Sequence, residues 1–411
     1  MSVHAPDGPA RQLLGALRGG TGAPQAGPAD WGAIAALACE HGVAPLLHRG
    51  LERAGGLARL PEAARAALAA ARRDTAARNL LHYAEFRRIA DAMAARALPL
   101  MALKGLHLAE LVYGDISLRP MADVDFLVPE ARVDEAAGVL RALGYGEGDA
   151  PVASAQVLES TCALGFTREA NGVYVELHWK LSEPADGFAA PMREIWQAAQ
   201  PCTLGGAPSL AMSPEFLLLH VGAHLACKHL FILPLRALAD IDAILGAHPG
   251  LDWDAFARHA ASHGWGRGVA LALRLAREQL DAPVPDRALA AVGAHALAPG
   301  LVAEALAQML DAPRLPAEVA TSPNFLGLAG RGAAARIGMV LRRVFVPRAE
   351  LAQLYGVSAR SPRLLPFYAV RLRDLVRRYG ASARELDRPG SALRDAAARR
   401  ARLSAWIGGG Q

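Results

Sequence analysis

Apolar residues recur every three or four positions over residues 31–53 and 61–97, and this spacing predicts helices near the start of the chain. Short apolar or alternating runs follow, and they predict strands over residues 98–103, 122–128, 164–169 and 173–179. Helical spacing between the first strands predicts helices over residues 105–113 and 130–143. From Ser213, an N-cap residue followed by proline, the helical pattern runs to about residue 245 and resumes at Trp253.

These patterns predict an α+β protein with a small mixed sheet flanked by helices. We divide the chain into a leader and N-terminal helical region (residues 1–97), a sheet core (98–205), a helical domain (206–300) and a C-terminal helical region (301–411). Residues 1–29 are rich in glycine, alanine and proline, so we expect a loose leader there.

Composition narrows the class of protein only a little. The 411 residues are 53% hydrophobic, enough for a sizeable core, and the net charge of +5 gives no strong nucleic-acid signal. We find no signal peptide and no apolar run long enough for a transmembrane helix, so we expect a cytoplasmic protein. The four cysteines are scattered without paired spacing, which argues against a disulfide framework or structural zinc.

The candidate chemistry centres on Asp123 and Asp125 in the predicted strand 122–128. Side chains alternate along a strand, so both carboxylates point to the same face. Adjacent carboxylates repel each other unless a cation lies between them, and hard oxygen ligands suit Mg²⁺ or Mn²⁺. A strand edge with two solvated aspartates is the simpler interpretation of an isolated Asp-x-Asp, but the neighbouring residues favour a metal site.

Those neighbours could hold phosphate. Lys104 and Gly105 follow the first predicted strand, where glycine permits close approach of the backbone and lysine supplies a positive charge. Arg119 lies four residues before Asp123 and could bring a second cation. Only three of the 44 basic residues are lysines, which favours a specific need for the compact ammonium group at Lys104.

The surrounding motifs resemble those of a bacterial family of uncharacterised nucleotidyltransferases, a branch of the polymerase-β-like superfamily. The motifs are Leu103-Lys104-Gly105, Tyr113-Gly114-Asp115, Leu118-Arg119-Pro120-Met121-x-Asp123-x-Asp125-Phe126-Leu127-Val128, Leu143-Gly144-Tyr145 and Val175-Glu176-Leu177-His178-Trp179. The resemblance extends through flanking segments around His41, Ser213, His224 and Asp240. It implies that residues 98–205 form a polymerase-β-like nucleotidyltransferase core.

The resemblance also implies a third acidic residue on a neighbouring strand, for which Glu176 is the candidate. The expected reaction transfers a nucleoside monophosphate from NTP to an acceptor hydroxyl and releases pyrophosphate. Asp123, Asp125 and Glu176 would then be both catalytic residues and ligands of Mg²⁺ or Mn²⁺. Two departures from the superfamily pattern weaken the expectation of activity: Lys-Gly replaces the usual Gly-Ser, and Ala122 stands where serine or threonine often precedes the first aspartate.

A second basic group is expected in the helical domain. His220, His224 and Lys228 are spaced by four residues and share one helix face, so we expect His224 and Lys228 to meet the nucleotide or the acceptor. A zinc site there lacks a third ligand of suitable spacing. Arg236 and Asp240, also four apart, are expected to pair along one helix.

Two other functions stay open at this point. A non-catalytic nucleotide-binding module would keep the fold without the reaction, and Ala122 is compatible with it. A metal-dependent glycosyltransferase also uses Asp-x-Asp, but it would need several βα units before that motif. The sequence names neither the nucleotide base nor the acceptor, which could be a small molecule, a sugar, a peptide or a protein side chain.

Overall fold

The computed structural model describes residues 8–18, 30–147, 161–183, 188–294, 297–316 and 323–326, some positions between 338 and 358, and residues 360–409. Its centre is a mixed sheet with strand order β3-β4-β5-β2-β1-β7-β6. The strands are β1 (Met101–Ala102), β2 (Val124–Leu127), β3 (Gly146–Glu147), β4 (Ala163–Arg168), β5 (Val173–His178), β6 (Gln200–Leu204) and β7 (Ala207–Ala211). The β2–β5 and β1–β7 pairs are parallel, and the other pairs are antiparallel.

Alternation along β2 separates a core face from a polar face. Val124 and Phe126 are fully buried in the cluster that the sheet forms with helices α4 (Glu62–Ala94) and α6 (Val133–Ala142). The parallel register places Asp125 beside Glu176 of β5. Because neighbouring residues in register share a face, both carboxylates lie on the side of the sheet away from α4 and α6.

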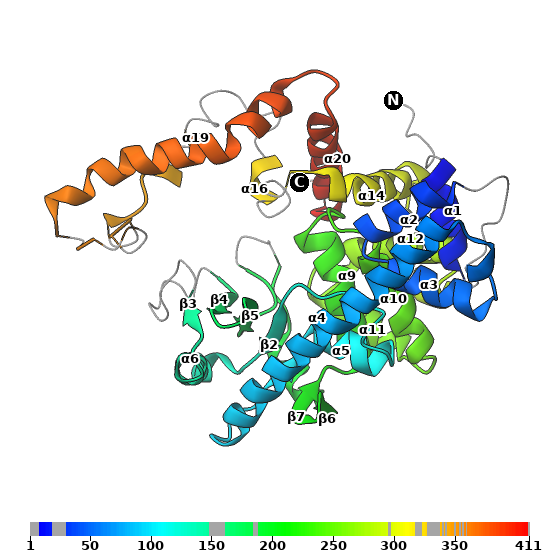
Figure 1. Ribbon diagram of the computed structural model, residues 1–411, viewed down its shortest axis with the longest axis horizontal. Helices are drawn as coiled ribbons and strands as arrows, with labels where there is room; N and C mark the ends of the chain where they lie inside the picture. Colours follow the sequence, from blue (N-terminus) through cyan, green and yellow to red (C-terminus); the bar gives the residue numbers. More distant parts are fainter. Residues whose placement is uncertain are drawn as a thin grey trace.

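Most helices lie to one side of the sheet, whereas α4 and α6 pack against it and α19 reaches away from the other helices (Figure 1). The N-terminal helices are α1 (Gly8–Leu17), α2 (Trp31–Glu40) and α3 (Ala44–Arg53). The short helices within the sheet region are α5 (Lys104–His107), continued by the π-helical turn Leu108–Val112, and α8 (Met192–Gln197). The later helices are α9 (Pro214–Ala223) with the π-helical turn His224–Lys228, α10 (Arg236–Ala247), α11 (Trp253–Ser262), α12 (Gly266–Leu280), α13 (Asp286–Ala291), α14 (Pro299–Asp311), α16 (Pro323–Leu326), α19 (Pro366–Asp387) and α20 (Ala392–Ile407).

The predicted α+β class is confirmed: the chain forms a mixed sheet, and helices precede and follow its strands in the sequence. The large hydrophobic core joins α1–α3 to α9–α14 and reaches the sheet through Met101 and Leu127. These two residues share the polar face of the sheet, so the helical core packs directly beside the carboxylates. Within the described residues, every helix is too short or too polar to span a membrane.

Besides the short strand β3, which was not predicted, three elements differ from the sequence-based expectation. The predicted leader contains α1, whose Leu13 and Leu14 are buried, and Arg18 just after it donates to the carbonyl oxygens of Glu278 and Gln279. The rest of the expected leader lies outside the described residues. α1 packs against α2 and α3 and also against α12, a helix some 260 residues later, so contacts outside the segment itself stabilise it.

The β6–β7 hairpin is the second difference, because no strand was predicted after residue 179. The hairpin pairs with β1 through β7 and extends the sheet to Ala211, beyond residue 205, where the sheet core was expected to end. The third is a break at residues 229–235 in the helix expected from Ser213 to about 245. Leu230 and Phe231 adopt left-handed backbone angles there, with φ of 47° and 62°, and a helix cannot continue through them.

Candidate active site

Three carboxylates converge at the adjacent strands β2 and β5. Asp123 immediately precedes β2, Asp125 lies within it, and Glu176 pairs in register with Asp125. Asp125 is buried with 7% of its surface exposed, whereas the side chain of Glu176 is 34% exposed. The three carboxylates, called the acidic site below, therefore run from the protein interior towards solvent.

Two basic side chains contact the buried aspartate. Lys104 Nζ lies 3.7 Å from Asp125 Oδ2, and His178 Nε2 lies 3.5 Å from Asp125 Oδ1. His178 Nε2 is also 3.2 Å from Glu176 Oε2. The strand alternation of β5 brings Glu176 and His178 to the same face, so one imidazole bridges two carboxylates.

The charges of the acidic site are strongly interdependent. Burial and the neighbouring charges of Asp125 and Glu176 raise the pKa of Asp123 to about 6. Burial also disfavours the charge of Asp125, but Lys104 and His178 outweigh it and hold the pKa of Asp125 well below its usual range. Burial opposes protonation of His178, yet its contacts with Asp125, Cys162 and Glu176 raise its pKa well above the usual value.

The acidic site fits a divalent cation. Among the described residues, the buried Oδ1 of Asp125 lies 3.5 Å from His178 but forms no hydrogen bond, so it could still bind a cation. Ligand atoms of Asp125, Glu176 and His178 lie within 4.8 Å of one another. Carboxylate oxygens are the preferred ligands of Mg²⁺ and Mn²⁺, and the raised pKa of Asp123 marks a position where added positive charge is favourable.

A basic cluster adjoins the acidic site and consists of Lys104, His220, His224, Lys228 and His229. Lys104 Nζ is 3.1 Å from His224 Nε2, which is 3.2 Å from His229 Nε2. Burial and then the charge of Lys104 lower the pKa of all three histidines, that of His229 to about 3. Lys104 and Lys228 therefore supply the positive charge of the basic cluster, and the neutral imidazoles surround it.

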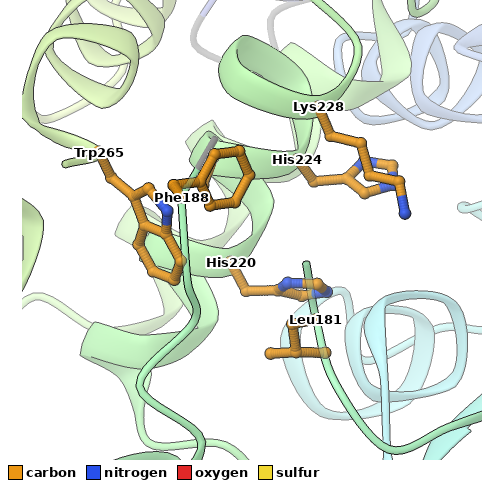
Figure 2. Close-up of a pocket in the computed structure, with 7 residues that line it drawn as sticks. Leu181, Phe188, His220, His224, Lys228 and Trp265 are labelled. Atoms are coloured by element: carbon orange, nitrogen blue, oxygen red, sulfur yellow. The ribbon is translucent and has the colours of Figure 1, made fainter. Parts of the chain in front are cut away.

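A small pocket opens beside the basic cluster (Figure 2), lined by Leu181, Phe188, His220, Ala223, His224, Lys228 and Trp265. The rings of Phe188 and Trp265 lie on one side of it, and His224 and Lys228 lie on the other (Figure 2). Within the described part of the chain, the buried Trp265 Nε1–H and His220 Nε2 have no hydrogen-bond partner. The pocket thus combines aromatic surface, unsatisfied polar atoms and positive charge.

Gly105 was expected to let the backbone approach a phosphate, and the structure shows that it also has a packing role. A Cβ atom at this position would come within 2.8 Å of the sulfur of Met121. Glycine therefore lets α5 pack closely against the segment that leads into β2, and a larger residue would force the side chain of Met121 to move. Phosphate binding at the backbone of Gly105 stays a prediction.

Arg119 is placed differently from the sequence-based expectation. Its Nε and Nη2 both donate to the carboxylate of Asp240 at 2.9 Å, and both side chains are at least 92% buried. Tyr113 donates to the same carboxylate at 3.0 Å. Phosphate binding by Arg119 would break a buried bidentate pair, which is costly. We therefore assign Arg119 to joining the sheet region to α10 instead of to phosphate.

The same pair corrects the expected link between Arg236 and Asp240. Arg236 donates to the carbonyl oxygen of Pro120, and Asp240 is taken by Arg119. The charge of Arg236 offsets part of the rise in the pKa of Asp123, so Arg236 lies near the acidic site.

Sequence reasoning missed His178 and His229 as members of this region. The alternation of Tyr174, Glu176 and His178 along β5 carried enough signal to select His178. His229 could not be found in the same way, because it follows the π-helical turn, in which its N–H bonds to the carbonyl oxygen of His224 at 3.1 Å. That turn breaks the four-residue spacing by which the other basic residues were selected.

Comparison with known proteins identifies the family. A model of the family described as uncharacterised nucleotidyltransferase matches residues 27–281, which is more than half of the chain. No curated protein matches. A solved solution structure of the antibiotic-resistance factor ANT(2'')-Ia is similar over 45% of this chain and 89% of that chain, with 16% sequence identity and a TM-score of 0.31. The family resemblance predicted from the motifs is confirmed, and the chain belongs to this family of uncharacterised nucleotidyltransferases.

Proposed function

We propose that the protein is a metal-dependent nucleotidyltransferase that transfers a nucleoside monophosphate from NTP to an acceptor hydroxyl. The hydroxyl oxygen forms a bond to the α-phosphorus, the bond between the α-phosphorus and its bridging oxygen to the β-phosphate breaks, and pyrophosphate leaves. The observation that carries this proposal is the convergence of Asp123, Asp125 and Glu176 on one sheet face beside the basic cluster. Family membership supports the transferase class.

The carboxylates would have different roles because their burial differs. Asp123 and Asp125 would hold Mg²⁺ or Mn²⁺, which when bound neutralises developing charge on the phosphates. Glu176 is the more exposed partner of Asp125, so it faces an incoming acceptor and would receive the proton of the hydroxyl. His178 contacts both Asp125 and Glu176 and would keep them oriented.

The basic cluster would receive the triphosphate. Lys104 lies between Asp125 and His224, and Lys228 lines the pocket with His224. The pKa values of the three histidines are lowered by burial and by Lys104, so the negative charge of a phosphate would be favourable in this region. The aromatic rings of Phe188 and Trp265 would contact the base or the acceptor from the other side of the pocket.

The proposal is tested by pyrophosphate release. Purified protein is incubated with each of the four NTPs, Mg²⁺ and a fractionated metabolite extract, because the acceptor is unknown. We expect release of pyrophosphate and labelling of one fraction by α-³²P-NTP, both lost on chelation of the metal and in Asp123→Asn. Nucleotide binding without pyrophosphate release from any fraction would favour the non-catalytic module instead.

A lysine substitution tests the phosphate contact. Lys104→Arg keeps the positive charge but puts a larger planar group into the space between Asp125 and His224, so we expect it to be nearly as harmful as Lys104→Ala. Each should weaken NTP affinity in Mg²⁺ by about tenfold or more, equal to roughly 1.4 kcal/mol. Affinity is measured by calorimetry with a non-hydrolysable NTP analogue.

Lys180→Arg is the matched control for this substitution. Lys180 is not a member of the basic cluster; it pairs with Glu130 at 2.9 Å, and both side chains are partly exposed. Arginine should serve there as well as lysine. If Lys104→Arg binds NTP as wild type does, with unchanged thermal stability, Lys104 is not a specific phosphate ligand.

A further inference from the structure

A second group of metal-ligating side chains lies outside the acidic site. Glu194 of α8 faces two residues of the helical domain, His259 of α11 and His263, which ends that helix. Glu194 Oε2 is 3.0 Å from His259 Nδ1 and 3.8 Å from His263 Nε2. The histidines are four residues apart, a spacing that brings two side chains to one helix face.

The spacing of these atoms suits a tetrahedral ion. Zn²⁺ binds nitrogen and oxygen ligands at about 2.0 to 2.2 Å, so neighbouring ligands in a tetrahedron lie about 3.3 to 3.5 Å apart. The two measured separations of 3.0 and 3.8 Å bracket this value, and all three ligand atoms lie within 4.8 Å of one another. Small rotations of the side chains would therefore complete three ligand positions.

The surroundings hold the imidazoles while leaving access for an ion. The ring of His259 lies 4.6 Å from that of Phe216, and the ring of His263 lies 6.0 Å from that of Trp265. The side chains of Glu194, His259 and His263 are 46%, 28% and 21% exposed. A simple ion pair would need only one histidine, yet both face the same carboxylate oxygen.

We propose that Glu194, His259 and His263 form a binding site for a borderline divalent cation of the zinc class, with water as fourth ligand. Two nitrogens and one carboxylate favour Zn²⁺ over Mg²⁺, which prefers an all-oxygen shell. The site does not depend on the proposed nucleotidyl transfer and shares no residue with the acidic site.

The ion would join the sheet region to the helical domain at the pocket. α8 lies between β5 and β6, and its Ile195 is buried in the core of the helical domain. Phe188 precedes Glu194 by six residues and Trp265 follows His263 by two, and both line the pocket. A metal bound by Glu194 and His263 would thus fix both aromatic walls of the pocket relative to each other.

The test uses Co²⁺ and Zn²⁺ on full-length protein without an affinity tag. Because His178 adjoins the acidic site and could also bind Co²⁺ or Zn²⁺, the titrations are made in Asp125→Asn with excess Mg²⁺. We expect one Co²⁺ per chain, with the intense visible absorption of tetrahedral Co²⁺, and its displacement by Zn²⁺. His263→Ala and Glu194→Gln in this background should each weaken binding at least tenfold and remove the Zn²⁺-dependent rise in Tm.

Further variants keep the test decisive if one of these misfolds. His259→Ala provides an independent loss of a ligand, and the same titrations are repeated in otherwise wild-type protein with the acidic site saturated by Mn²⁺. His248→Ala is the control, because His248 is partly buried on the helical domain and belongs to neither site. Unchanged Co²⁺ affinity and spectrum in His263→Ala and His259→Ala, or no binding at micromolar Co²⁺, overturns the proposal.

Discussion

Asp125→Asn is expected to remove most of the metal dependence of nucleotide binding. Asp125 is the most buried of the three carboxylates, and among the described residues its Oδ1 lies 3.5 Å from His178 without forming a hydrogen bond. Losing its charge removes a ligand of the proposed ion, so the affinity for a non-hydrolysable NTP analogue in Mg²⁺ should fall at least tenfold. Affinity is measured by calorimetry with non-hydrolysable analogues of each of the four NTPs, once in Mg²⁺ and once in EDTA.

Asp123→Asn is the informative partner of this substitution. It should weaken metal-dependent binding as well, but the effects of the two substitutions on folding should be opposite. Burial and neighbouring carboxylates raise the pKa of Asp123, so its charge is unfavourable in the metal-free protein and asparagine should raise Tm at pH 7 to 8. Asp125 is stabilised by Lys104 and His178, so Asp125→Asn should lower Tm.

The opposite effects expected of Asp123→Asn and Asp125→Asn on Tm differ from what the sequence alone predicts. From Asp-x-Asp alone, both substitutions would be expected to leave folding intact or improved, because each removes a repulsion. The structure adds the two cations that face Asp125 and so separates the two aspartates. Equal Mg²⁺-dependent NTP affinity in wild type and both variants would overturn the assignment of these aspartates to a metal site.

Side-chain alternation explains why Asp123 and Asp125 could be placed on one face from the sequence, whereas Glu176 became a candidate through the family resemblance. Two strands with period two fix which residues share a face, and the motif Val175-Glu176-Leu177 has the same period as Val124-Asp125-Phe126. The parallel pairing of β2 with β5 then brings Asp125 beside Glu176. The register between β2 and β5 could not be predicted from the sequence and is known only from the structure.

Arg119 shows the limit of that reasoning. Its nearness in sequence to Asp123 suggested a shared ligand, but Asp240, 121 residues later, takes both nitrogens that face it. A buried guanidinium must be paired, and Asp240 becomes the partner of Arg119 because α10 packs against the sheet region. Local spacing contains no information about that packing.

The missed hairpin is a different kind of error, because its signal is local. Gly205 and Gly206 connect β6 to β7 with φ of 55° and 79°, and a pair of glycines between two apolar runs is typical of a two-residue hairpin turn. The break before α10 was harder to predict. Leu230 and Phe231 are apolar residues in left-handed conformations, and only their burial against the helical core accounts for them.

The glycosyltransferase alternative receives no support from the architecture. It requires several βα units before Asp-x-Asp to bind the nucleotide diphosphate. In the described part of the chain before Asp123, the only strand is β1, and helices precede it. A catalytic nucleotidyltransferase and a non-catalytic nucleotide-binding module would both use the site as built, and they differ in the role of Glu176.

Glu176→Gln is expected to separate turnover from nucleotide binding. Glu176 is 34% exposed at the side chain and lies on the solvent side of Asp125, where an acceptor would approach. Glutamine keeps the shape and can still contact His178, but it cannot take a proton from the hydroxyl. Pyrophosphate release with the acceptor should therefore fall by roughly two orders of magnitude or more, while NTP affinity changes less than about threefold.

Two further variants show whether a loss of turnover in Glu176→Gln reflects the role of Glu176 as proton acceptor. Glu130→Gln removes a half-exposed carboxylate that pairs with Lys180, and it should leave both turnover and NTP affinity unchanged. His178→Gln should lower turnover through the orientation of Glu176 and Asp125, and it should weaken NTP binding as well, because His178 contacts both carboxylates. Wild-type turnover in Glu176→Gln would place the third carboxylate elsewhere, since a residue that receives the proton cannot be replaced by an amide without loss of rate.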